Sequence, residues 1–180
     1  MEEFFEALNP VVVLGGLRNF LETGGDVLVV IMAATFILWA LIVERYWYFM
    51  GAHRSVIKSA IGTWGERSDH TSWYAHQIRR SLIADVRMSS TANLGAIKAM
   101  VAIAPLLGLL GTVTGMVEVF DVMAFTGSSN ARAMAAGVSK ATIPTMAGMV
   151  ASLSGLFFSS SLERRAKREI QRVADSMVLQ

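Results

Sequence analysis

The sequence lacks cysteine and is poor in histidine, proline and charged residues. Its 180 residues include no cysteine, three histidines and three prolines, and 17% of them are charged. The absence of cysteine excludes a disulfide framework and a thiolate metal site. No histidine has a potential ligand partner four residues on, so no metal site is expected. The charged fraction lies below the roughly 25% of an ordinary soluble domain, and the net charge of +2 gives no indication of nucleic-acid binding.

Patterns of enzymatic chemistry are also missing. The sequence shows no nucleophile–base pairing and no metal-ligand cluster. The glycine-rich segment 108–115 lacks the lysine of a phosphate-binding loop. We therefore expect neither catalysis nor a cofactor.

Three long runs without charged residues are the main positive feature. They cover residues 27–43, 100–117 and 141–162. A helix of about 20 apolar residues spans the roughly 30 Å hydrocarbon core of a bilayer. The first run is the shortest, but an aromatic cluster at its end is typical of the membrane–water boundary. This cluster consists of Trp39, Tyr46, Trp47 and Tyr48. Acidic rather than basic residues precede the run, which argues against a cleaved signal peptide and favours an uncleaved first span.

The runs predict an all-α integral membrane protein with long cytoplasmic helical extensions. Lysine and arginine concentrate after the first run and after the third, and such residues mark the cytoplasmic side. The N-terminus and the turn between the second and third runs are then periplasmic. The predicted segments are an N-terminal periplasmic or interfacial segment at 1–26, transmembrane helices at 27–48, 99–125 and 132–162, a cytoplasmic helical segment at 49–98, a periplasmic turn at 126–131 and a cytoplasmic helical tail at 163–180.

Glycine pairs are expected to interrupt the N-terminal segment. Gly15-Gly16 and Gly24-Gly25 lie before the first run. Adjacent glycines often mark a break between elements. We therefore expect an amphipathic interfacial helix that is separate from the first span.

The second and third runs carry small residues at helical spacing. Such residues let two helix backbones approach closely, and Gly111-xxx-Gly115 has the familiar spacing for this contact. The expected packing residues are Gly108, Gly111, Gly115, Gly148 and Gly155. Spacing alone leaves open whether these residues only pack helices or also form the wall of a pore.

Hydroxyl groups accompany the small residues. Counting equal distances from the turn places Thr112 at nearly the depth of Thr145, and Thr142 and Ser152 lie on the same helix as Thr145. Repeated around an oligomer, hydroxyls at one depth form a polar ring, so all four are candidate pore-lining residues. The alternative is that the threonine hydroxyls bond to carbonyls of their own helix.

Charge and proline add two further expectations near the turn. The same count from the turn places Glu118 and Lys140 at nearly the same depth. They therefore either form an ion pair at a pore entrance or remain two solvated side chains. Pro144 lies within the third span, where it removes a backbone hydrogen bond and can expose a carbonyl near Thr145.

None of the three runs contains aspartate, glutamate or histidine. Proton transfer at membrane depth needs a titratable group. If protons pass through this protein, a carboxylate placed against Thr112 and Thr145 must therefore come from another chain.

Two motifs resemble the MotA/TolQ/ExbB proton channel family, and its ExbB branch most. They are Ala104-Pro-Leu-Leu-Gly-Leu-Leu-Gly-Thr-Val-Thr-Gly-Met116 and Gly137-Val-Ser-Lys-Ala-Thr-Ile-Pro-Thr-Met-Ala-Gly148. Val43-Glu-Arg-Tyr46 is similar to the end of the first span in ExbB-like chains. The resemblance is specific over residues 95–160, whereas 1–26 and 50–94 match only in size and topology. The chain looks like a short accessory form.

The resemblance implies a specific machine. ExbB-like proteins form pentamers in the inner membrane whose second and third spans line a pore. Two helices of ExbD-like single-span proteins, each with a membrane aspartate, lie inside. Their movement is passed to a TonB-like protein and energises outer-membrane uptake of iron–siderophore complexes or vitamin B12.

Residue by residue, the resemblance is incomplete. The family's pore threonines correspond to Thr112 and Thr145, but its glutamate in the third span corresponds to Lys140. A base cannot relay protons as that acid does, so the role is not carried over. A TolQ-type or gliding-motility stator subunit, and a structural membrane scaffold without conduction, remain alternatives.

Overall fold

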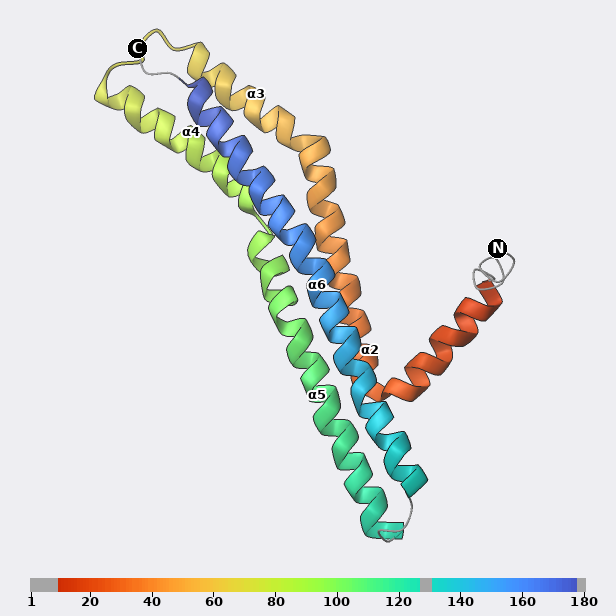
Figure 1. Cartoon of the computed structure of the whole chain (residues 1–180). Helices are drawn as coiled ribbons and strands as arrows, with labels where there is room; N and C mark the ends of the chain where they lie inside the picture. Colours follow the sequence, from red (N-terminus) through yellow and green to blue (C-terminus); the bar gives the residue numbers. More distant parts are fainter. Residues whose placement is uncertain (1–9, 127–130, 178–180) are drawn as a thin grey trace. The chain divides into compact units, whose positions relative to one another are not determined.

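Every element that the structure describes is a helix. The structure is a computed structural model that describes residues 10–126 and 131–177 (Figure 1). Its helices are α2 (Pro10–Met50), α3 (Ala52–Gly65), α4 (Trp73–Thr91), α5 (Leu94–Thr126) and α6 (Ala131–Ser176). The predicted all-α class is confirmed. Parts of the predicted segments 1–26, 126–131 and 163–180 lie outside the described residues, namely 1–9, 127–130 and 178–180.

Three helical stretches are long and apolar enough to cross a membrane, as predicted. They fall within Gly24–Met50, Trp73–Phe125 and Met134–Ser176. Large apolar side chains on them are exposed, including Phe36, Leu106 and Phe157. An exposed apolar surface is the normal condition of a helix that faces lipid or a neighbouring subunit.

The chain divides into two compact units, which we describe separately. The hairpin unit comprises Met1–Ile37 and Met100–Leu153, and the basic unit comprises Leu38–Ala99 and Ser154–Gln180. Each unit therefore contains residues from α2, α5 and α6, and the basic unit also contains α3 and α4.

Helix α2 is interrupted once, in the hairpin unit. Gly25 has φ 66° and ψ −169°, a conformation that glycine adopts at low cost because it lacks a Cβ atom. The break expected at Gly24-Gly25 is thus found at Gly25. The break expected at Gly15-Gly16 is wrong, because both residues are helical. A glycine in a helix interior costs only about 1 kcal/mol, so a glycine pair does not by itself end a helix.

The basic unit contains a buried apolar core. It joins α3, α4 and the end of α6 through Trp64, Val86, Val173 and Met177, all at most 4% exposed. The Arg79 guanidinium on α4 donates to the carbonyls of Ala174 and Met177, both at 2.7 Å. These bonds satisfy carbonyls that the end of a helix leaves without a partner.

The segment Val43–Tyr46 has a structural role in the same unit. The buried Arg45 side chain donates to the carbonyl of Ala92 at 2.5 Å and to that of Ser89 at 2.9 Å, so it caps the end of α4. Asn93, at φ 59°, donates its side-chain amide to Glu44 at 2.9 Å. A cation at a helix C-terminus also interacts favourably with the helix dipole. The end of α2 thereby fixes the junction between α4 and α5.

Candidate functional site

Helices α5 and α6 form an antiparallel hairpin that packs backbone against backbone. A Cβ atom added at Gly115 would lie 2.7 Å from Cβ of Ala141, and one added at Gly148 would lie 2.5 Å from the carbonyl oxygen of Ala104. At Gly108 the nearest atom would be Cα of Thr145, at 3.0 Å. No side chain fits at these three positions without separating the helices, so glycine sets the helix spacing here.

Gly111 also lies in this contact between helices, but its neighbours there are side chains and not backbone atoms. An added Cβ atom would collide with the ring of Pro144 on α6 and come within 3.4 Å of Val27 on α2. Pro144 is buried, and α6 stays helical through it. Gly155, the fifth expected packing glycine, is buried in the basic unit.

Two hydroxyl groups bond across the hairpin. Thr145 Oγ1 on α6 donates to the carbonyl of Gly108 on α5 at 3.1 Å. Ser152 Oγ donates to the carbonyl of Val101 at 2.9 Å. The two bonds are seven residues apart on both helices, 145 to 152 and 108 to 101, which is the repeat at which two supercoiled helices meet again. The bonds therefore lie in the contact seam of the hairpin.

The bond from Ser152 has a specific cause in the sequence. In an α-helix the carbonyl of Val101 normally accepts from the N–H of residue 105. Residue 105 is proline, which has no N–H. The Ser152 hydroxyl supplies the missing donor. This role was not predicted, although Pro105 itself identifies the carbonyl four residues earlier as the one left free.

The structure agrees with the predicted near alignment of Thr112 and Thr145. Their hydroxyls donate to the carbonyls of adjacent residues of α5, Leu109 and Gly108, which lie about 1.5 Å apart along the helix axis. The contact of Gly115 with Ala141 fixes the hairpin register, and these two residues lie at equal distances along the sequence from residue 128. The two hydroxyls therefore lie at nearly the same depth.

The two threonines also use their hydroxyl protons differently. Thr112 Oγ1 donates within its own helix, to the carbonyl of Leu109 at 2.7 Å. Thr142 does the same to Ser139 at 2.9 Å. Thr145 instead donates across the hairpin. In every case the hydroxyl oxygen keeps lone pairs that can accept a hydrogen bond from another group.

Glu118 and Lys140 form an ion pair at one end of the hairpin unit. Lys140 Nζ lies 2.5 Å from Glu118 Oε2, with the side chains 34% and 56% exposed, respectively. The Lys140 side chain also covers Gly25, where an added Cβ atom would lie 3.2 Å from Cε. A cavity of about 220 Å³ adjoins the pair, and Asp26 and Thr114 contribute to its lining. The pair is thus part of a polar pocket between helices of the hairpin unit.

Within residues 10–126 and 131–177 there is no group of three or more histidine, aspartate or glutamate side chains that could hold a metal ion. In the uncharged runs 100–117 and 141–162, the polar side chains are those of threonine and serine. Such groups can guide or orient a proton but cannot themselves carry one through the centre of a membrane.

Comparison with known proteins finds a matching family and several relatives. Residues 52–175, more than half of the chain, match the MotA/TolQ/ExbB proton channel family. A Helicobacter pylori biopolymer transport protein termed ExbB-like 1 is 30% identical over 100 residues, which cover 56% of this chain and 53% of that protein. A Synechocystis protein termed ExbB-like 1 is 41% identical over 63 residues, covering 33% of this chain and 25% of that protein. The chain thus spans about half the length, or less, of the curated relatives it matches.

Proposed function

Because the chain belongs to the MotA/TolQ/ExbB proton channel family, we propose that it is the channel and stator subunit of an inner-membrane motor of the TonB–ExbB–ExbD type. Such a motor uses the proton motive force to energise outer-membrane uptake, here of iron–siderophore complexes or vitamin B12. The protein is a multi-pass membrane protein with three candidate spans.

The observation that carries this proposal is the hydroxyl-lined hairpin. Thr112 and Thr145 present oxygens at nearly the same depth on two apolar helices. The runs 100–117 and 141–162 contain no titratable group at their depth. A single-span partner with a membrane aspartate supplies the group that proton transfer requires. In this proposal five copies of the chain surround the partner, with Thr112, Thr142, Thr145 and Ser152 toward the proton path.

The same proposal includes an orientation. The N-terminal segment and the turn at 126–131 are periplasmic, while residues 49–98 and 163–180 are cytoplasmic. The excess of lysine and arginine in the latter two segments supports this arrangement. Glu118 and Lys140 then lie near the periplasmic entrance, where their ion pair tunes the approach of protons without relaying them.

Substitution of Thr145 tests the channel function. Thr145→Val keeps the shape of the side chain but removes the hydroxyl, whereas Thr145→Ser keeps the hydroxyl and serves as the matched control. We expect the valine variant to assemble normally and to reduce siderophore-dependent growth at least about tenfold, because proton-path groups commonly contribute factors of this size or more. The serine variant should retain most of the growth.

A second measurement separates the channel from a scaffold. Proton uptake is followed in vesicles that hold the chain together with its aspartate-bearing partner. Equal uptake by the wild type and by Thr145→Val, with normal assembly, would contradict a hydroxyl role in the proton path. Uptake that is absent from the wild-type complex itself would favour a non-conducting scaffold. Rescue of a Tol or a gliding defect instead of siderophore uptake would reassign the machine.

A further inference from the structure

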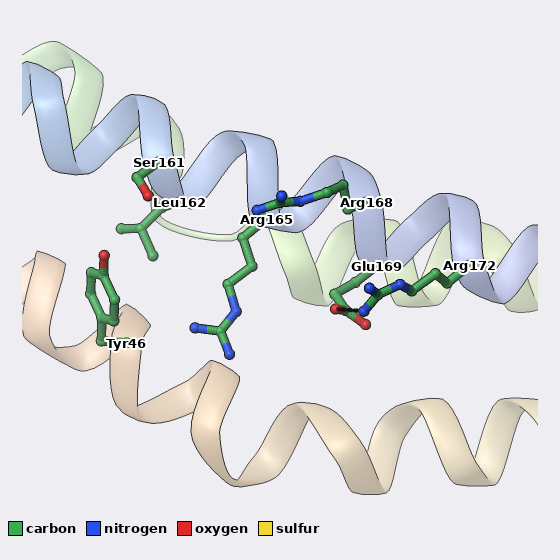
Figure 2. Close-up of a pocket in the computed structure, with 7 residues that line it drawn as sticks. All are labelled: Tyr46, Ser161, Leu162, Arg165, Arg168, Glu169 and Arg172. Carbon is green, nitrogen blue, oxygen red and sulfur yellow. Dashed lines mark hydrogen bonds and ion pairs between the residues drawn. The ribbon is translucent and has the colours of Figure 1, made fainter.

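A pocket in the basic unit combines arginines with an aromatic ring. It lies between the end of α2 and the first charged turns of α6 and has a volume of about 450 Å³. Figure 2 shows Tyr46 rising from one helix and Arg165 and Arg168 extending from the other. Arg172 and Glu169 complete its polar side.

Two of the three arginines in this pocket lack a carboxylate partner. Arg172 Nη1 is 2.8 Å from Glu169 Oε1, so these two charges offset each other. Among the residues that the structure describes, neither Arg165 nor Arg168 forms an ion pair. The nearby Glu163 does not neutralise them, because it pairs with Lys98 at 2.8 Å and with Lys167 at 3.0 Å. The pocket therefore carries an uncompensated positive charge.

Tyr46 and Leu162 form the apolar side of the pocket, and further aromatic residues pack next to it. The Tyr46 ring packs edge-on against Phe158 at 6.4 Å, and Trp39 packs against Phe158 at 5.0 Å. The Arg165 guanidinium lies over Phe49, 5.4 Å from the ring centre, an arrangement that holds a cation in place. His53 packs on the same ring at 5.0 Å, and burial lowers its pKa, which disfavours the charged form.

The position of the pocket along both helices matches the surface of a bilayer. Leu162 is the last residue of the third apolar run, and the charged tail begins at the next residue. Tyr46 lies in the aromatic cluster that ends the first run. Tyrosine and tryptophan collect at headgroup depth, and basic pockets between transmembrane helices bind acidic headgroups there.

We propose that this pocket binds the phosphate of an anionic phospholipid headgroup through Arg165 and Arg168, with the acyl chains along the apolar side. The fork of a guanidinium suits phosphate oxygens. A ligand with one charged and one apolar end uses both sides of the pocket, which a free phosphate ion or a soluble acidic peptide does not. The site is independent of the proposed motor function.

The test uses the full-length chain in detergent and native mass spectrometry. Dioleoylphosphatidylglycerol is compared with zwitterionic dioleoylphosphatidylcholine. We expect the wild type to bind the anionic lipid roughly tenfold more tightly, because each arginine near an anionic lipid surface contributes a factor of several. Arg165→Gln/Arg168→Gln should abolish this preference. Arg168→Gln alone should weaken the preference. Arg164→Gln removes the same single charge from an exposed neighbour that does not line the pocket, and it should retain the preference.

Other outcomes overturn the proposal. Equal loss in Arg164→Gln and in the double variant means that only the general charge of the tail matters. Displacement of the lipid by millimolar inorganic phosphate would identify a free-anion site, and preferential binding of a polyglutamate peptide would identify a protein partner. If the double variant does not fold, Arg168→Gln alone gives the measurement. An unchanged lipid preference in that variant would then exclude a role for Arg168.

Discussion

The hairpin unit and the basic unit are held together by different interactions. In the hairpin unit, glycines bring α5 and α6 into backbone contact, and hydroxyls bond to carbonyls across the seam. In the basic unit, large apolar side chains form a core and two arginines cap helix ends. One polypeptide thus uses two modes of helix packing.

The difference follows from the solvent for which the hairpin unit and the core between α3, α4 and the end of α6 are each suited. Burial of large apolar side chains stabilises helices in water, because water excludes apolar surface. In lipid this driving force between helices disappears, and close packing with interhelical hydrogen bonds replaces it. An arginine can cap a helix end only where its charged group lies close to water or headgroups, because burial of the charge in lipid is unfavourable. We therefore expect equivalent substitutions to have opposite or unequal effects in the two units.

The largest difference is expected for glycine-to-alanine substitutions. Gly148→Ala places a Cβ atom 2.5 Å from the Ala104 carbonyl oxygen and 3.2 Å from Cα of Gly108. Because both contacts are with backbone, the helices must separate, at a cost of about 3 kcal/mol. The free energy of unfolding in detergent, measured by titration with sodium dodecyl sulfate, should fall by that amount.

Gly62 on α3 provides the matched control. It is exposed, and an added Cβ atom would have nothing within 4 Å. Gly62→Ala should raise the free energy of unfolding by about 0.5–1 kcal/mol, because alanine favours the helix. If the free energy of unfolding changes in the same direction in both variants, close packing at glycine does not distinguish the two units.

The sequence predicted both the faces that form this seam and the approximate register of the helices. Glycine and threonine at intervals of three and four identified the contacting faces, because helical periodicity is local. The equal count from the turn agrees with the contact of Gly115 with Ala141. The partner of each hydroxyl, such as Gly108 for Thr145, could not be predicted, because it depends on packing between helices and not on one helix alone.

The arginine caps could not be predicted for a similar reason. Arg45 lies 44 and 47 residues from the two carbonyls that it caps, and Arg79 lies 95 and 98 residues from its carbonyls. Sequence patterns placed both arginines in a basic segment and Arg45 also in the motif Val43–Tyr46, but they identified no carbonyl partner for either. Contacts across such separations arise from the tertiary fold.

A smaller effect is expected from the cap in the basic unit. Arg79→Gln removes two charge-assisted bonds to the end of α6, whose net contribution we put at about 2 kcal/mol in all. Arg80→Gln is the control, because the neighbouring Arg80 is exposed and forms no ion pair among the described residues. The free energy of unfolding should fall for Arg79→Gln and stay within about 0.5 kcal/mol for Arg80→Gln.

Amide hydrogen exchange shows which part of the chain loses stability in Arg79→Gln. Amide protection at the end of α6 should fall in Arg79→Gln while protection in α5 between residues 104 and 115 is unaffected. A loss of protection spread equally over both units would mean that Arg79 does not act as a local cap.

The smallest effect concerns the carbonyl freed by Pro105. Ser152→Ala removes the donor to Val101 and should lower the free energy of unfolding by about 1 kcal/mol, the usual contribution of an interhelical hydrogen bond in a membrane protein. Ser160→Ala is the matched control, because the Ser160 hydroxyl bonds only within α6, to Phe157. Its effect should stay within about 0.5 kcal/mol.

Combining Ser152→Ala with Pro105→Ala identifies the cause. Alanine at position 105 restores the backbone N–H that normally bonds to the carbonyl of Val101. In that background Ser152→Ala should cost much less than in the wild type, which gives a coupling energy of close to 1 kcal/mol in the double-mutant cycle. Additive effects of the two substitutions would show that the serine stabilises the hairpin independently of the proline. The Ser152 hydroxyl would then be one of the polar groups that line the hairpin unit. It would not act as a replacement for the backbone N–H that Pro105 lacks.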